Sequence, residues 1–102
     1  MPGKRPGETS RRLKVVIPDG GHVIVVGRTK EDCDRILRLL QPRCTTKGAT
    51  LKAFSQLHQM EELGGEKADV LILHSGLGPT ARETVVWTVQ RTNRSVDVID
   101  LK

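Results

Sequence analysis

The sequence predicts a single α/β domain of the three-layer Rossmann or flavodoxin-like class, with a mostly parallel sheet of four to five strands. Short apolar runs alternate with segments of helical periodicity, in the order β-β-α-β-α-β-α-β, which implies parallel strands joined by right-handed crossovers. Two runs, His22–Gly27 and Ala68–His74, are apolar enough to be buried on both faces. Only 2% of the 102 residues are aromatic, so the core must consist of Val, Ile and Leu.

The chain divides into residues 1–12, which we expect to form a flexible basic leader, and residues 13–102, which we expect to form the domain. The leader is rich in Pro and Gly and has no periodicity. It also holds four of the cations behind the net charge of +5 and one acid: Lys4, Arg5, Arg11, Arg12 and Glu8. It is either a solvated tail or an arm that contacts the phosphates of a nucleic acid.

The first two expected strands are Leu13–Ile17 and His22–Gly27, the second of them central in the sheet. Between them Pro18–Gly21 predicts a turn in which Gly20 and Gly21 both accept a positive φ. If the two strands form a hairpin, the second keeps only one free edge. A flavodoxin-like order needs both of its edges for parallel partners, and the sequence leaves this conflict open.

The first helix is the most clearly marked element. Thr29 is the expected N-cap, with Asp32 at the acidic position of a capping box. Pro42 is expected to stop the helix, which places Cys44 just past its end. Apolar residues recur at i, i+3, i+4 and i+7 and form one buried stripe: Cys33, Ile36, Leu37 and Leu40.

The middle of the chain predicts a strand at Gly48–Phe54 and a helix at Gln56–Leu63, followed by the buried strand Ala68–His74. Gly64 is expected to end the helix as a left-handed cap. The two cysteines do not have zinc-site spacing. Together with the absence of a signal peptide or an apolar run of membrane-spanning length, they favour an intracellular, cytoplasmic location with no membrane partner.

The final helix is expected to open at Pro79 or Thr80, with Thr80 and Glu83 as a second capping box. The segment Thr84–Val89 is rich in strand formers, so a strand is the alternative. The cap signals and the length favour a helix that turns three valines toward the sheet: Val85, Val86 and Val89. Ser95–Leu101 is the expected closing strand.

Two strand-to-helix loops are the candidate ligand-binding residues. The first runs from Ser75 to Thr80: two glycines let the backbone approach an anion, and the helix behind them presents unpaired N–H groups and its positive dipole end. The alternative is a plain turn. The second is the loop after the first central strand, whose arginine suits phosphate. The residues are Ser75, Gly76, Gly78 and Thr80 in one loop and Gly27, Arg28 and Thr29 in the other, side by side if the two central strands are neighbours.

The stretch Ala68-Asp-Val-Leu-Ile-Leu-His-Ser-Gly-Leu-Gly-Pro-Thr80 resembles the loop of the molybdopterin-binding (MogA/CinA-like) domain family, which has Gly-Gly-x-Gly-Pro-Thr and then an acidic pair. The resemblance implies that the loop embraces the anionic part of a pterin or nucleotide. Here Ser75 replaces the first glycine, and Arg82 and Glu83 stand where two aspartates are usual. About 15 residues carry the match.

These features favour a small, non-catalytic domain that binds an anionic, phosphate-bearing nucleotide or a pterin-like ligand. One alternative is a basic module that contacts nucleic acid or an acidic protein. Another is a decayed relative of the SGNH-type hydrolases, because Gly27-Arg28-Thr29 lies where they carry Gly-Asp-Ser, although no histidine follows Asp97 or Asp100. No dinucleotide or P-loop motif and no metal spacing is present, and no cofactor or oligomeric state is indicated.

Overall fold

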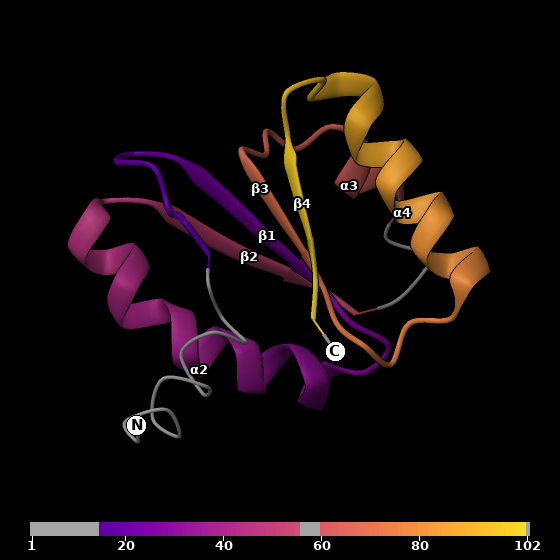
Figure 1. The fold of residues 1–102 in the computed structure, drawn as a ribbon, viewed down its shortest axis with the longest axis horizontal. Helices are drawn as coiled ribbons and strands as arrows, with labels where there is room; N and C mark the ends of the chain where they lie inside the picture. Colours follow the sequence, from indigo (N-terminus) through magenta and orange to yellow (C-terminus); the bar gives the residue numbers. More distant parts are fainter. Residues whose placement is uncertain (1–14, 56–59, 102) are drawn as a thin grey trace, which may run out of the picture.

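The computed structural model describes residues 15–55 and 60–101 and shows one parallel sheet of the order β2-β1-β3-β4 (Figure 1). This is the order of the first four strands in the flavodoxin-like arrangement 2-1-3-4-5, so the expected α/β class is confirmed. The strands are β1 (His22–Val26), β2 (Thr50–Phe54), β3 (Val70–Leu73) and β4 (Asp97–Asp100). In the register, Val26 lies beside Leu73, and Leu73 beside Asp100.

Helices cover both faces of the sheet, as Figure 1 shows. They are α2 (Lys30–Lys47) on one face, and α3 (Met60–Gly64) and α4 (Pro79–Thr92) on the other. Alternate residues of β1 point to opposite faces: Val23 and Val25 pack in the cluster under α2, whereas Ile24 and Val26 pack in the cluster under α4. Burial on both sides explains why this strand is an unbroken apolar run.

The expected strand at Leu13–Ile17 is wrong for the part that the structure describes. Residues 15–17 are not in the sheet; they lie against α2, with Val15 and Ile17 buried in its apolar cluster. Arg43 holds this segment, because its guanidinium donates to the Val15 carbonyl at 2.6 Å. Both edges of β1 are therefore available for β2 and β3, which resolves the conflict that a hairpin would create.

The turn before β1 is confirmed with one change. The Gly21 N–H donates to the Pro18 carbonyl at 3.0 Å. Gly20 has φ +66°, but Gly21 does not share that positive φ. Gly21 is glycine for space: a Cβ there would lie 2.4 Å from Pro18 Cγ.

Helix α2 begins as expected and ends later. The Thr29 hydroxyl accepts from the Asp32 N–H at 3.2 Å, so this N-cap is confirmed. Pro42 does not stop the helix, which continues to Lys47 and bends along its length (Figure 1). Cys44 is consequently inside the helix and fully buried, not past its end. The extra turn persists because Cys44 packs in the core while Pro42 faces solvent.

The left-handed cap belongs to Gly48, with φ +65°, and not to Gly64, which lies within α3 and has no positive φ. The Gly48 cap leads directly into β2 at Thr50. Of the helix expected at Gln56–Leu63, residues 56–59 lie outside the described part, as does the basic leader.

Helix α4 confirms that Thr84–Val89 is coiled. Val85 and Val89 are buried against the sheet and Val86 is half-buried. The expected capping box of Thr80 and Glu83 is wrong: Pro79 is the first helical residue and Gly78 is the N-cap, with no side-chain capping bond. Among the described residues, no helix has the length and apolarity to cross a membrane.

Candidate functional site at the carboxyl rim of the sheet

The two candidate loops lie on the same rim, because β1 and β3 are parallel neighbours and both loops follow the carboxyl ends of these strands. Residues that flank the two loops are in contact: His74 Nδ1 lies 3.5 Å from Asp32 Oδ2, which α2 supplies. The expected proximity of the loops is therefore present. The contact also means that the space between β1 and β3 holds a histidine–aspartate pair.

The loop after β1 is mostly committed to starting α2. Gly27 is buried, and a Cβ there would lie 3.0 Å from Cys33 Sγ. The Thr29 hydroxyl is occupied by the N-cap bond. Arg28 is exposed like Thr29, but it makes no hydrogen bond or ion pair with any other described residue. Of this loop's three predicted site residues, Arg28 alone has a side chain that is exposed and unengaged.

The loop after β3 is folded around His74. The Gly76 N–H donates to His74 Nδ1 at 2.9 Å, and the Leu77 N–H donates to the His74 carbonyl at 3.1 Å. A Cβ on Gly76 would lie 3.1 Å from His74 Nδ1 and 3.3 Å from Asp32 Oδ2, so this glycine admits the close packing. Ser75 is exposed at the tip of the turn.

A pocket of about 550 Å³ opens beside this loop, but one strand away from the expected crevice. It lies at the ends of β3 and β4 instead of between β1 and β3. Ser75 is the one predicted site residue among those that line it. The lining residues are Leu73, His74, Ser75, Leu77, Arg82, Asp100 and Leu101.

Arg82 and Asp100 form the polar wall of this pocket. Arg82 Nε and Nη2 donate to the two carboxylate oxygens of Asp100, each at 2.7 Å. This hydrogen bonding, with the negative charge of Asp100, raises the pKa of Arg82. A guanidinium has five N–H donors, so three of them are not used by the pair. Arg82 therefore stays cationic, fixed in orientation, and able to donate to a second acceptor.

The start of α4 connects two residues that line the rim pocket, Leu77 and Arg82. Gly78 is an extended N-cap with φ −73°, and a Cβ placed on it would meet no atom within 4 Å. The N–H groups of the first helical turn lack intrahelical acceptors, and this turn contains no acidic residue. The first turn of α2, in contrast, carries Glu31 and Asp32. The helix dipole is thus offset by acids at α2 and is not offset at α4.

Three of the residues that shape the rim, His74, Arg82 and Asp100, are not among the predicted site residues. The position of His74 and Asp100 at strand ends was an available signal, because ligands of open α/β sheets gather outside the carboxyl ends of strands. No local feature of the sequence marks Arg82 in this way, because its bond with Asp100 depends on how α4 lies relative to the end of β4.

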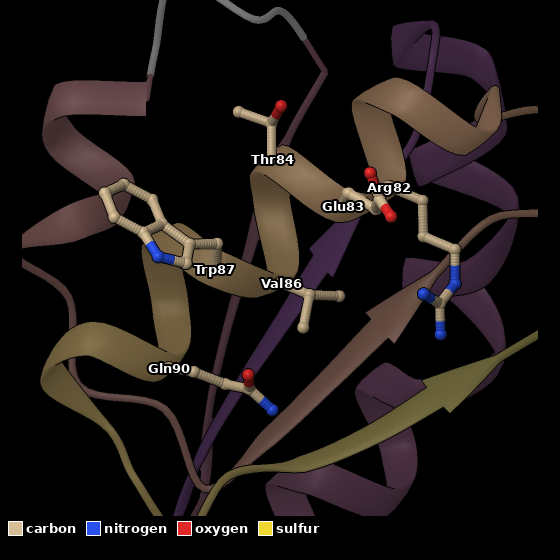
Figure 2. Close-up of a pocket in the computed structure, with 6 residues that line it drawn as sticks. All are labelled: Arg82, Glu83, Thr84, Val86, Trp87 and Gln90. Carbon is tan, nitrogen blue, oxygen red and sulfur yellow. The ribbon is translucent and has the colours of Figure 1, made fainter.

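A second hollow, of about 650 Å³, lies on the outer side of α4 (Figure 2). Figure 2 shows Arg82, Val86 and Gln90 projecting toward the strands, while Trp87 lies on the other side of the helix. The Trp87 side chain is 62% exposed, and the Arg91 guanidinium carbon lies 4.8 Å from its ring centroid. No predicted site residue lines this hollow; Arg82 is shared with the rim pocket.

Neither cysteine is placed for reactivity. Cys33 and Cys44 are buried in the cluster under α2, and burial raises the pKa of each thiol. No group of three or more His, Cys, Asp or Glu side chains in the described ranges is arranged to hold a metal ion. Comparisons of the chain with protein-family models, with curated proteins and with solved structures find no match.

Proposed function

We propose that this chain is a small binding domain that holds the anionic group of a small molecule, such as the phosphate of a nucleotide or of a pterin-like compound, in the rim pocket. The observation that carries the proposal is the position of Arg82, which lies in the first turn of α4 and in the wall of the pocket. A hollow of about 550 Å³ is within the usual range of small-ligand sites. Its wall includes Arg82, which lies in the acid-free first turn of the 14-residue helix α4.

The expected donors come from three directions. The N–H groups of Thr80 and Ala81 supply the positive end of α4. Arg82 supplies up to three further N–H donors, and although Asp100 balances its charge, bonds from a guanidinium are about twice as strong as neutral ones. The Ser75 hydroxyl adds an adaptable donor at the tip of the loop. Leu73 and Leu77 form an apolar floor that suits the uncharged part of a ligand.

The pocket favours binding over catalysis. A serine nucleophile needs a base within hydrogen-bonding reach. His74, which is the adjacent histidine, uses its Nδ1 atom with Gly76 and Asp32. Arg82 and Asp100 neutralise each other, so this pair does not supply a free acid or base.

Gly78→Val tests the proposal. The added side chain points into open space and φ is −73°, so the fold accepts valine at a cost of roughly 1 kcal/mol for a weaker N-cap. The valine would cover the N–H groups at the start of α4. We expect the affinity for sulfate and for a nucleoside monophosphate, measured by calorimetry, to fall at least tenfold.

Gly65→Val is the matched control. Gly65 lies before β3, at the opposite rim of the sheet, and a Cβ there makes only an ordinary 3.7 Å contact with the Glu62 carbonyl. This variant should bind as the parent does. Unchanged binding by Gly78→Val would refute the rim pocket as the site.

Removal of residues 1–12 separates this proposal from nucleic-acid contact through the leader. Small-anion binding at the rim should survive the truncation. Binding that depends on the leader should disappear with it and should weaken steeply with salt.

A further inference from the structure

We propose that His74 is a proton-controlled switch of the loop after β3, and that protonation of its ring opens the loop for anion binding. The inference rests on the proposed function for its ligand, but the switch itself is a property of the loop. It derives from two contacts of one atom, His74 Nδ1, that call for opposite protonation states.

The contact with Gly76 needs an unprotonated Nδ1. Because the Gly76 N–H donates to this atom at 2.9 Å, Nδ1 must offer a lone pair. The neutral ring satisfies this with its proton on Nε2. In this state the Gly76 N–H is occupied within the loop and is not available to a ligand.

The contact with Asp32 favours a protonated Nδ1. The carboxylate oxygen Oδ2 lies 3.5 Å from Nδ1, longer than a good hydrogen bond but within ion-pair range. A proton on Nδ1 would face the Gly76 N–H, two donors in one place, and would be attracted to Asp32. The ring would then move toward Asp32, and the Gly76 N–H would be released.

The other charged groups near the ring do not reverse the expected effect of protonation on anion affinity. Asp32 reaches it from α2; Arg82 from α4 and Asp100 from β4 line the same pocket and are paired with each other. The imidazolium would offset the negative charge of Asp32, and the freed Gly76 N–H would add a donor at the rim. Both changes favour an anion, so affinity should fall as the pH rises through the range in which histidines lose their charge, about 5 to 8.

The test measures the loop and the ligand separately. In the ligand-free protein, nitrogen–proton NMR between pH 5 and 8.5 follows the Gly76 amide and the His74 ring. We expect both to change with one midpoint. Calorimetry with sulfate, whose charge is constant in this range, should then show binding about tenfold tighter at the acidic end, as for one hydrogen bond gained to a charged group.

His74→Asn should hold the loop in its neutral form, because the amide oxygen can accept from Gly76 at every pH. Sulfate binding should then stay weak and independent of pH. His22→Asn is the control: the His22 ring pairs with the Thr50 hydroxyl, and its backbone N–H donates to Asp69, at the other end of β1. Loss of this ring should leave the response intact.

Each result has a distinct meaning. If the Gly76 amide does not titrate with the His74 ring, the switch is wrong, whatever binds. If the amide titrates but sulfate does not bind at any pH, the proposed function fails and the switch remains. If sulfate binds and its pH dependence survives in His74→Asn, the switch is refuted while the rim site stands.

Discussion

Pro42 offers the most direct test of how α2 is held together. A proline within a helix has no N–H for the carbonyl four residues earlier, here that of Arg38, and it disfavours the helix by about 3 kcal/mol relative to alanine. The helix nevertheless runs from Lys30 to Lys47 without a break. Pro42 is exposed, so its replacement loses no core contact. Pro42→Ala should therefore stabilise the protein.

The expected gain is smaller than the full helix penalty. Removing a proline frees the unfolded chain, which costs about 0.4–1 kcal/mol. The bend of α2 already relieves part of the clash, and straightening it would disturb Cys44, which is fully buried. We expect a net gain of about 1–2 kcal/mol and a rise in Tm of roughly 5–10 °C.

Urea unfolding at constant temperature is the appropriate assay, with an unchanged m-value showing that the unfolded surface is the same. Pro79→Ala is the matched control. Pro79 is the first residue of α4, where no N–H is needed, so this change should cost about 0.4–1 kcal/mol. Equal or lower stability of Pro42→Ala would refute the reasoning and would show that the packing of Cys44 requires the bend.

Two further predictions concern the stability of the fold in urea. Gly21→Ala should cost about 1–3 kcal/mol in urea unfolding, because its Cβ would lie 2.4 Å from Pro18 Cγ; unchanged stability would contradict the turn. The raised pKa values of Cys33 and Cys44 mean that the folded state favours the neutral thiols. The stabilisation that these two thiols contribute is complete below the ordinary thiol pKa, about 8.5. It is lost as the pH rises through the pKa values that the thiols have in the folded state. From pH 7.5 to pH 10, the urea midpoint should fall less in a double Cys→Ala variant than in the parent. An equal fall in the two proteins would disprove this.

The strands that local pattern defines were predicted correctly. β1 and β3 are buried on both faces, and this requirement is visible in their own residues as unbroken apolar runs. The segment before β1 was predicted wrongly, because Val15 and Ile17 alternate with exposed Val16 in the manner of a half-buried strand. What excludes them from the sheet is that β2 and β3 take both edges of β1, a fact of topology that local sequence does not contain.

The two loops were expected to share a rim, and they do, but the pocket on that rim lies at another pair of strands. Glycines and cap signals identify loops, and parallel strands place those loops together. Which gap stays open depends on side chains that are distant in sequence. Asp32 reaches His74 between β1 and β3, whereas Arg82 bonds Asp100 beside the opening at β3 and β4.

The contrast between the two helix N-termini leads to a final prediction. Glu31 is the second residue of α2, and Thr80 is the second residue of α4. Thr80→Glu would give α4 the acid that α2 already has. A carboxylate there should stabilise the helix dipole by about 0.3–1 kcal/mol and occupy the place of the anion. Stability in urea should rise while sulfate binding is abolished.

Two controls separate charge from size and from position. Thr80→Gln has the size of the glutamate without its charge, and should lower sulfate affinity only a few-fold. Gln90→Glu adds the same charge to exposed surface ten residues further along α4, on the order of 15 Å away, and should leave most of the binding intact. A protein that gains stability from Thr80→Glu and still binds sulfate as before has its anion somewhere other than the start of α4. If the N-terminus of α4 lacks acids because a ligand binds there, Thr80→Glu must raise stability and lower sulfate affinity in the same protein.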